Sequence, residues 1–397
     1  MNILFIGGDG SYTNANSVCI SNMAHEMERC GHKVWVLSLG DGPDQVPDTY
    51  YGKLKIRAAQ KPTLLRKLWL KMFDLARHIV LLPFYPNVAP CRSRKMARKA
   101  EDLVRKNEIE LVVAVFNVYE NIYAGMQLKK RFGDSVKVVS YHLDLRTSSV
   151  NPSALIRNYI YKHALASVVK ENKVVDKMLI PYSGQKDIET LHGLDKNKIK
   201  FVGFPVLIEE NEFEKCDFPF ENDAINIAYI GSLSVDNRNP KYILSLLEQA
   251  EVILNRKIKV HIWGNMEDVE QILKDSSVVN YHGKIENRFV RYVMDNADFL
   301  LNVGNAITYT MLPSKVFGMF ATGKPIINVV AHPDDAVLPY FERYDNSIDI
   351  REYQKTSTDA NVLADGIKEM MQAPLKESKS LFDDFRPETI CKIIMEK

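Results

Sequence analysis

The sequence predicts an α/β fold with two parallel sheets, each covered by helices on both faces. Three observations predict it. The chain has 397 residues, enough for two or three domains of roughly 100–200 residues each. Short continuous apolar runs alternate with segments of helical periodicity, as expected for strands buried on both faces of a parallel sheet. The alternation restarts after about 200 residues, so two similar halves are expected.

The first half begins with a strand predicted at Ile3–Ile6 and a glycine-rich turn directly after it. A helix is predicted at Asn16–Cys30, because its apolar residues recur on one helical face. Further strands are predicted at Val34–Leu37, Leu111–Phe116 and Val136–Tyr141, with helices between them. Strands joined in series by helices imply a parallel sheet.

The second half repeats this arrangement. Strands are predicted at Ile225–Ile230, Val260–Trp263, Val278–His282, Phe299–Val303 and Ile326–Val330, and a glycine follows each of the first four. Helices fit between these strands, for example at Asn239–Leu254 and Arg288–Asp295. The second half is therefore predicted to form its own parallel sheet.

These patterns predict a Rossmann-like domain at 1–205, a linker at 206–224 and a second Rossmann-like domain at 225–379. The linker is acidic, contains Pro219 and lacks clear periodicity. A last helix within about 380–397, at Pro387–Met395, can return to pack on the first domain. Two such domains imply a cleft between them, and ligands of open α/β sheets bind outside the C-terminal ends of strands.

The composition is that of a soluble globular protein, with 46% hydrophobic and 26% charged residues. The net charge of +2 says little about partners. The five cysteines are scattered without zinc-ribbon or CxxC spacing, which fits a reducing cytoplasm. The N-terminal segment reads as a strand and not as a signal peptide, and no apolar run approaches the ~20 residues of a membrane span. We expect a soluble or peripheral cytoplasmic protein.

One segment is strongly basic. Lys61–Lys106 contains twelve Lys or Arg residues and three Asp or Glu residues, interspersed with leucines and aromatics. Such a segment can dock on the anionic inner face of a membrane. The alternative is an irregular helical insertion that packs on its own domain.

The glycine-rich turn Gly7-Gly8-Asp9-Gly10 lets a ligand approach the backbone. It does not fit the dinucleotide fingerprint G-x-G-x-x-G, because Thr13 occupies the third glycine position. The acidic candidate for a ribose, Asp41, lies 31 residues beyond Gly10, where the fingerprint expects about 20. A nicotinamide cofactor is therefore disfavoured, and a tight turn without a ligand is the alternative.

Three polar residues, His142, Asp144 and Arg146, follow a predicted buried strand. A histidine and a carboxylate at the C-terminal end of a strand can hold sugar hydroxyls or relay a proton. The alternative is a solvated loop.

The loops of the second half carry a similar set of candidates. Gly231, Ser232 and Arg238 suit a diphosphate, because arginine binds phosphate oxygens bidentately. Gly264 allows a close approach of a ligand, and the backbone at Gly283, Lys284 and Ile285 can flank a base. An exposed loop arginine is the alternative for Arg238, and His282 is more simply a packing residue.

Ser314 and Lys315 stand at the predicted start of a short helix. A cation is disfavoured in the first turn of a helix, so a bound phosphate would explain Lys315. The alternative is a core helix, with Val316 and Phe317 buried and a lysine stem that reaches back to water.

Together these segments resemble the GT-B glycosyltransferases, most closely the retaining family 4. The first βαβ unit is similar, and so is the order of YIGSL (229–233), IWGN (262–265), YHGKI (281–285) and PSKVFGMFATGKPII (313–327). The resemblance covers nearly the whole chain. Pro-Ser-Lys before the last helix places the chain near the subset of family 4 that shares it.

The resemblance implies a hexosyltransferase-type enzyme that takes a sugar from a nucleotide-sugar donor, UDP-linked, in the C-terminal half. The acceptor, lipid-linked or a polysaccharide, would lie in the N-terminal half, as in bacterial surface glycan synthesis. No cofactor, metal or nucleic acid is implied. Residues near the reaction would be His142, Arg238 and Lys315. Donor contacts would come from Gly231, Ser232, Gly264, Gly283, Lys284, Ile285, Ser314 and Gly318, and acceptor contacts from Gly8, Gly10 and Asp144.

The sequence departs from the family in two places. Family members usually carry Glu-x7-Glu where this chain has Thr310 and Gly318, and they usually carry Arg after the first glycine of the donor half, where this chain has Ser232. Two alternatives to a transferase therefore stay open, namely a sugar-nucleotide epimerase and a non-catalytic GT-B-like partner subunit. A Rossmann oxidoreductase is a more distant one.

Overall fold

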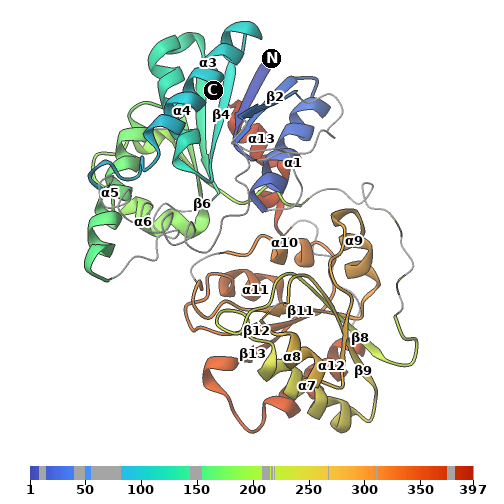
Figure 1. Ribbon diagram of the computed structural model, residues 1–397. Helices are drawn as coiled ribbons and strands as arrows, with labels where there is room; N and C mark the ends of the chain where they lie inside the picture. Colours follow the sequence, from blue (N-terminus) through green and yellow to red (C-terminus); the bar gives the residue numbers. More distant parts are fainter. Residues whose placement is uncertain are drawn as a thin grey trace, which may run out of the picture. The chain divides into compact units, whose positions relative to one another are not determined.

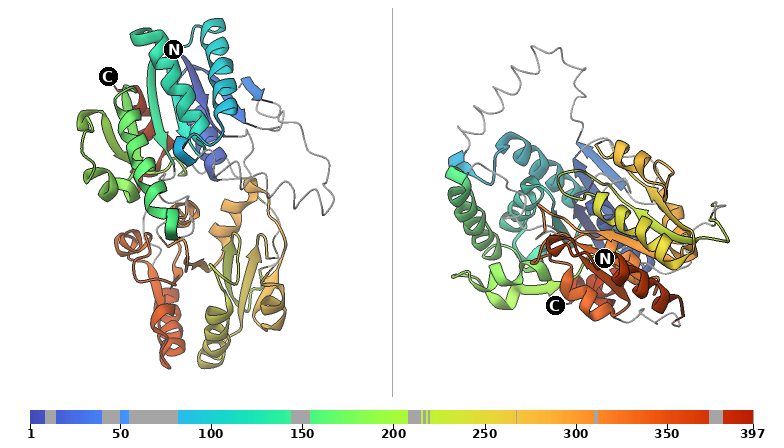
Figure 2. Two further views of the ribbon diagram at one scale, coloured as in Figure 1. Left: turned by 60° about the vertical axis from the view of Figure 1, so that its left-hand side comes forward. Right: turned by 90° about the horizontal axis from the view of Figure 1, so that it is seen from below.

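The computed structural model describes residues 1–8, 15–39, 50–54, 82–143, 154–207, 215, 218, 220–266, 268–309, 312–372 and 381–396. The chain divides into two compact units, one made of Met1–Pro205 with Asp384–Lys397 and the other of Val206–Asp383. Each unit contains one sheet with helices packed beside it (Figures 1 and 2).

The first unit contains a seven-stranded parallel sheet in the order β3-β2-β1-β4-β5-β6-β7. Its strands are β1 (Asn2–Ile6), β2 (Lys33–Leu39), β3 (Tyr50–Leu54), β4 (Leu111–Phe116), β5 (Lys137–His142), β6 (Lys177–Pro181) and β7 (Ile199–Val202). The helices of this unit are α1 (Ala15–Arg29), α3 (Pro90–Lys106), α4 (Tyr119–Phe132), α5 (Ala154–Asn172), α6 (Gln185–Glu189) and α13 (Pro387–Met395). The strand order runs outward in both directions from β1 and β4.

Alternation along the strands divides the first core between two faces. Leu4, Val112 and Val138 point to one face and pack in a single cluster with buried residues of α3 and α4. Tyr141 points to the other face, near Cys19 of α1 and Cys391 of α13, where burial raises the pKa of its hydroxyl. α1 and α13 also pack against each other, so the C-terminal helix completes the core of the first unit (Figure 1).

The second unit contains a six-stranded parallel sheet in the order β10-β9-β8-β11-β12-β13. Its strands are β8 (Ile225–Ile230), β9 (Ile258–Trp263), β10 (Val279–Tyr281), β11 (Phe299–Val303), β12 (Ile326–Val330) and β13 (Ser347–Arg351). Its helices are α7 (Lys241–Leu254), α8 (Glu270–Asp275), α9 (Asn287–Asn296), α10 (Lys315–Phe320), α11 (Leu338–Tyr344) and α12 (Asp359–Gln372). The direction of winding reverses between β8 and β11.

Polar residues inside the second sheet pair with one another in register. Asn302, Asn328 and Asp349 stand opposite each other on β11, β12 and β13. The Asn302 amide donates to Asn328 Oδ1 at 2.9 Å, and the Asn328 amide donates to Asp349 Oδ1 at 2.9 Å. A buried polar group costs free energy unless it is hydrogen-bonded, and this ladder limits that cost at three adjacent strands.

The predicted fold class is confirmed, because two parallel α/β sheets wind as in Rossmann-like domains. Several predicted strands coincide with observed ones, including Leu111–Phe116 and Ile225–Ile230. Several candidates lie outside the described residues, namely Gly10, Thr13, Asp41, Asp144, Arg146, Thr310 and the part of Lys61–Lys106 before residue 82. Within the described part of the chain, no helix is long and apolar enough to cross a membrane.

Substitution of Gly203 tests how tightly the C-terminal segment packs on the first unit. A Cβ atom built at this glycine would lie 2.6 Å from the backbone oxygen of Asp384 and 2.8 Å from the Phe385 ring. We expect Gly203→Ala to lower the free energy of unfolding by about 1–3 kcal/mol, the usual cost of overpacking, as measured by thermal and urea denaturation.

Gly318→Ala is the matched control, because Gly318 lies within helix α10 and a Cβ atom there would be 3.8 Å from Met294 Cε, an ordinary contact distance. That variant should be as stable as the wild type or slightly more so. Equal stability of Gly203→Ala and the wild type would contradict the packing of Asp384 and Phe385 on this glycine.

Candidate functional site

The carboxyl edge of the second sheet gathers most of the predicted residues. β8 and β11 are neighbours, and the winding direction reverses between them. Gly231 follows β8, while Gly304 and Asn305 follow β11. In open α/β sheets this reversal leaves a crevice at the carboxyl ends of the two strands, which is where ligands bind. The topology alone therefore selects this edge as the candidate site.

The loop after β8 is held in one conformation by its own polar groups. The backbone groups of Ser234 and Arg238 exchange two hydrogen bonds of 3.1 Å. The Asn237 side chain ties this loop to the loop after β11, because its oxygen accepts from the backbone N–H groups of Ile307 and Thr308. Its amide donates to Asn305 Oδ1 at 3.2 Å. Asn237 therefore joins the two loops that border the reversal point.

Arg238 is oriented from the neighbouring strand. Its Nε donates to Asn305 Oδ1 at 2.7 Å, and Asn305 is buried. The backbone N–H groups of Asn305 and Val337 in turn donate to the Asp335 carboxylate. The guanidinium therefore has a fixed direction, while its terminal NH₂ groups make no hydrogen bond within the described residues.

Asp335 brings a buried carboxyl group to the same cluster. Its Oδ2 atom has no hydrogen-bond partner among the described residues and packs against Gly304. Burial raises the pKa of this carboxyl to about 6, although the backbone donors and the charges of His332 and Arg238 act in the opposite direction. Asp335 can therefore change its protonation near neutral pH.

Lys315 lies over the end of β8. Its Nζ atom is 4.2 Å from the centroid of the Tyr229 ring, and a Cβ atom on Gly231 would lie 3.0 Å from it. The Tyr229 hydroxyl donates to Ser232 O at 2.9 Å, which holds the ring in place. The amine is buried and has no hydrogen-bond acceptor among the described residues.

This environment disfavours the charged form of Lys315. Burial, and then the charge of Arg238, hold the pKa of its amine well below the ordinary value. A buried amine beside a guanidinium is stabilised when an anion provides acceptors and negative charge to both. Two basic side chains predicted separately from sequence thus interact, and among the described residues the Lys315 amine has no hydrogen-bond acceptor.

The start of α10 offers fewer free N–H groups to an anion than its sequence suggests. The helix has six residues, Ser314 has a helical backbone conformation, and its side chain makes no capping hydrogen bond. The N–H groups of Val316 and Phe317 already donate to Pro313 O and Ser314 O. The side chain of Lys315, and not the helix terminus, is therefore the group available to an anion here.

Three predicted glycines stand side by side at the ends of β8, β9 and β10. A Cβ atom on Gly264 would lie 1.9 Å from Gly231 O, so the two backbones themselves require glycine at residue 264. The Gly264 N–H donates to Gly283 O at 2.8 Å, and Gly283 has a positive φ of 76°. Close packing of the loops thus explains Gly264 without a ligand.

The remaining donor-side candidates lie at or near the same edge. Ser232 and Lys284 are exposed, and Ile285 is half-buried. Gly318 lies within α10 with space around it. No hydrogen bond or ion pair of the Lys284 side chain occurs within the described residues.

The first unit places Gly8 and His142 at the carboxyl edge of its own sheet. Gly8 follows β1 with a φ of 72°, and His142 ends β5. The His142 side chain is 2% exposed, stacks on Phe116, and its Nε2 lies 2.8 Å from Glu171 Oε1 of α5. The predicted acceptor-side partners Gly10 and Asp144 lie outside the described residues.

Four residues of the site were missed by sequence reasoning, namely Tyr229, Asn237, Asn305 and Asp335. A signal existed for two of them, because Asn305 and Asp335 follow β11 and β12 as His142 follows its strand. The contact of Tyr229 with Lys315 joins residues 86 positions apart, which no local pattern reveals. Among the described residues, no group of three or more histidine, cysteine, aspartate or glutamate side chains could hold a metal ion.

Each unit has the parallel, helix-covered sheet of a Rossmann-like domain, and solved structures with two such domains match the chain. The chain is similar to sucrose-phosphate synthase from Thermosynechococcus elongatus, with 11% identity and a TM-score of 0.63 over 99% of this chain and 96% of that one. It is also similar to WaaG, a glycosyltransferase involved in lipopolysaccharide biosynthesis, with 11% identity and a TM-score of 0.60 over 100% of both chains. The chain therefore has the GT-B fold predicted from its sequence.

A third structure with this likeness is a protein assigned as a UDP-N-acetylglucosamine 2-epimerase from Listeria monocytogenes. It is 10% identical, with a TM-score of 0.55 over 98% of this chain and 93% of that one. No protein-family model and no curated protein matches the sequence. At these identities the comparisons establish the fold, and the activity has to be argued from the site.

Asp335 predicts a pH dependence of stability. The pKa of Asp335 is raised from 3.8 to about 6 in the folded protein. The folded state therefore binds this proton more tightly than the unfolded state, and the free energy of unfolding falls as pH rises from 3.8 to about 6. We expect Asp335→Asn to be more stable than the wild type above pH 6, by on the order of 2 kcal/mol after solvent screening.

Urea denaturation of both proteins between about pH 3 and pH 8 measures this difference. The gap should narrow as pH falls from about 6 and close near pH 3, where Asp335 is largely protonated in the folded and the unfolded state. Asp334→Asn is the control, because Asp334 is exposed beside Asp335. A gap that is constant with pH would show that Asp335 ionises normally.

Proposed function

We propose that the protein is a glycosyltransferase whose donor is a nucleotide sugar bound at the carboxyl edge of the second sheet. The observation that carries this proposal is the buried amine of Lys315, which lies beside Arg238 and has no acceptor among the described residues. A diphosphate supplies both negative charge and acceptor oxygens to two such cations. The GT-B fold of the chain supports a sugar nucleotide as the source of that diphosphate.

The chemistry would use these cations to stabilise the leaving group. The bond between the anomeric carbon and the diphosphate oxygen breaks, the acceptor hydroxyl oxygen bonds to that carbon, and the hydroxyl proton passes to solvent. The nucleoside diphosphate leaves with the added negative charge. Lys315 and Arg238 lie where this charge develops, and preorganised cations of this kind lower the barrier.

The finer features of the donor follow from the resemblance to family 4. We infer a UDP-linked hexose, with Gly231, Ser232 and Gly264 near the diphosphate and the sugar. Gly283, Lys284 and Ile285 would flank the base, and Ser314 and Gly318 would border the phosphates and the ribose. Transfer would proceed with retention of configuration and without a metal ion.

The acceptor side is proposed for the first unit. Gly8 and Gly10 would border the acceptor, Asp144 would bind its hydroxyls, and His142 would lie near the transferred sugar. The partnership of His142 with Glu171 would fix the imidazole. A lipid-linked or polysaccharide acceptor of bacterial surface glycan synthesis, reached from the cytoplasm, is favoured by the likeness to WaaG.

The missing Glu pair at Thr310 and Gly318 leaves a donor hydroxyl without its usual carboxylate. We infer that Asp335 takes this role. Its Oδ2 is buried without a partner among the described residues, and Arg238 is close enough to lower its pKa.

A sugar-nucleotide epimerase is the second candidate, favoured by the likeness to the Listeria protein. It would convert the donor when no acceptor is present, so incubation with the donor alone separates the two activities. A non-catalytic partner subunit would bind the nucleotide sugar without converting or transferring it.

The first test of the site is donor binding by Lys315→Met and Arg238→Gln. A panel of nucleotide sugars is screened by thermal shift, since a ligand that binds the native state raises the melting temperature. We expect the wild type to respond to one class of nucleotide and both variants to lose the response. Removal of a buried unpaired amine should leave the ligand-free melting temperature of Lys315→Met unchanged or higher.

Turnover with the identified donor should fall by a factor on the order of 10² or more in each variant, the scale of one preorganised electrostatic contact. Lys368→Met is the control, because Lys368 is exposed on α12 and should retain wild-type binding and turnover. Wild-type activity in both site variants would disprove the assignment of the diphosphate to Lys315 and Arg238.

A further inference from the structure

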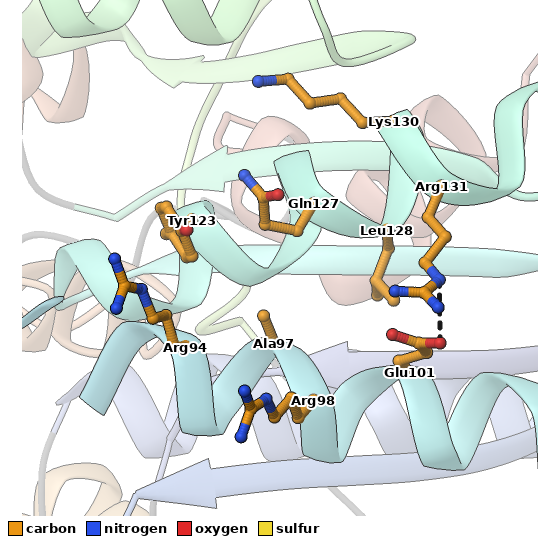
Figure 3. A pocket seen from close by; sticks show the side chains of 9 residues that line it. All are labelled: Arg94, Ala97, Arg98, Glu101, Tyr123, Gln127, Leu128, Lys130 and Arg131. Atoms are coloured by element: carbon orange, nitrogen blue, oxygen red, sulfur yellow. Dashed lines mark ion pairs between the residues drawn. The ribbon is translucent and has the colours of Figure 1, made fainter. Parts of the chain in front are cut away.

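Helices α3 and α4 of the first unit border a pocket of about 350 Å³ (Figure 3). It lies within the first unit and contains none of the residues proposed for the donor. The polar side chains that line it come from α3 (Arg94, Arg98 and Glu101) and from α4 (Tyr123, Gln127, Lys130 and Arg131). Ala97 and Leu128 form its apolar part.

The lining of the pocket is strongly positive. Four cations and one carboxylate leave a net charge of +3. Glu101 Oε1 lies 2.9 Å from Arg131 Nε and 3.1 Å from Arg105 Nε, so two guanidinium groups share its single charge. Figure 3 shows the pair of Arg131 and Glu101 across one end of the pocket. Arg94, Arg98 and Lys130 make no ion pair within the part of the chain that the structure describes.

The uncharged polar groups of the pocket are also available. Tyr123 and Gln127 are half-buried, and neither makes a hydrogen bond to any described residue. With Arg94, Arg98 and Lys130 they make five side chains that can donate hydrogen bonds and have no acceptor in the described structure. An anion with several oxygens is the ligand that such a set of donors recognises.

We propose that this pocket binds a phosphate group, and that the phosphate belongs to the head group of an anionic phospholipid. Guanidinium groups match phosphate oxygens bidentately, and Lys130 adds a point charge. Two features favour a membrane as the source. α3 presents Lys95 to solvent as well, and Phe84, six residues before the helix, is 64% exposed. A basic helix beside an exposed aromatic is typical of binding at a membrane surface.

Membrane docking is predicted for the whole basic segment Lys61–Lys106, and the pocket uses only the α3 part of that segment together with α4. Binding of a phospholipid at this pocket does not depend on transferase activity. Donor binding and vesicle binding are measured separately, so failure of either proposal leaves the other standing.

The experiment compares the full chain with Arg94→Gln/Arg98→Gln/Lys130→Gln in sedimentation with vesicles. The vesicles contain equal parts of phosphatidylglycerol and phosphatidylcholine, and vesicles of phosphatidylcholine alone serve as the uncharged reference. We expect the wild type to bind the anionic vesicles, and the triple variant to bind them about 10²-fold more weakly, since each basic residue contributes roughly 1 kcal/mol at such a surface. The control Lys162→Gln/Lys170→Gln/Lys196→Gln removes the same charge from exposed sites of the first unit.

A second variant, Gln127→Glu, places a carboxylate in the pocket with almost no change of shape. It should weaken binding at least tenfold while the melting temperature stays that of the wild type. A parallel titration with glycerol 3-phosphate, which lacks acyl chains, separates the two possible sources of phosphate.

Loss of vesicle binding in both pocket variants, with binding retained in the control, supports the lipid head group. If the wild type binds glycerol 3-phosphate but no vesicles, and the pocket variants lose glycerol 3-phosphate binding, the phosphate site is supported and the membrane is overturned as the source of the phosphate. Equal weakening in the control and the triple variant would mean that only total charge matters, which overturns the pocket. Absence of both kinds of binding in the wild type overturns the proposal altogether.

Discussion

The second unit depends on one unusual placement, that of the Lys315 amine over the Tyr229 ring with no acceptor among the described residues. A core that served only stability would gain by replacing such a group with an apolar one. The surrounding residues instead hold it in place. The backbone of Gly231 leaves space for the lysine, and the Tyr229 hydroxyl is fixed by Ser232 O. The arrangement holds a buried amine whose charged form is disfavoured by burial and by Arg238, and a ligand with negative charge would stabilise that form.

Sheet topology explains why Lys315 and Arg238 belong to one cluster. The winding of the second sheet reverses between β8 and β11, so the loops after these strands must diverge around one point. Asn237 bridges the two loops, and Asn305 directs Arg238 from the far one. Asn237 and Arg238 lie in the loop after β8, and Asn305 lies in the loop after β11. The parallel order of these two strands brings the two loops together. The site is therefore a property of the sheet, and single motifs describe it incompletely.

Sequence reasoning reached the fold because strands buried on both faces are continuous apolar runs, as at Leu111–Phe116 and Phe299–Val303. It did not find β7 or β13, where lysine or aspartate interrupts the apolar residues. It also missed β6, whose apolar run between Lys177 and Pro181 is short. Local patterns also located Arg238 and Lys315, because a charged residue after a strand or at a helix start is conspicuous. They could not find the partners that orient these cations, since Asn305 and Asp335 act through contacts between distant loops. For Gly264, sequence reasoning predicted a ligand contact that is not needed to explain the residue. The oxygen of Gly231 lies so close to Gly264 that no side chain fits there, and this contact cannot be seen in the sequence.

Among the described residues, both units contain basic side chains that form no ion pair, and the two settings differ physically. In the second unit the Lys315 amine is buried, so its attraction to an anion is strong, short-ranged and little screened by salt. In the first unit Arg94, Arg98 and Lys130 are exposed, so their attraction reaches further and is screened within about 8–10 Å at physiological ionic strength. A buried cation suits a ligand that must be held with one geometry during a reaction. An exposed group of cations suits a surface that is approached from solution and left again. Burial thus distinguishes a basic side chain that suits a tightly held ligand from basic side chains that suit reversible binding to a surface.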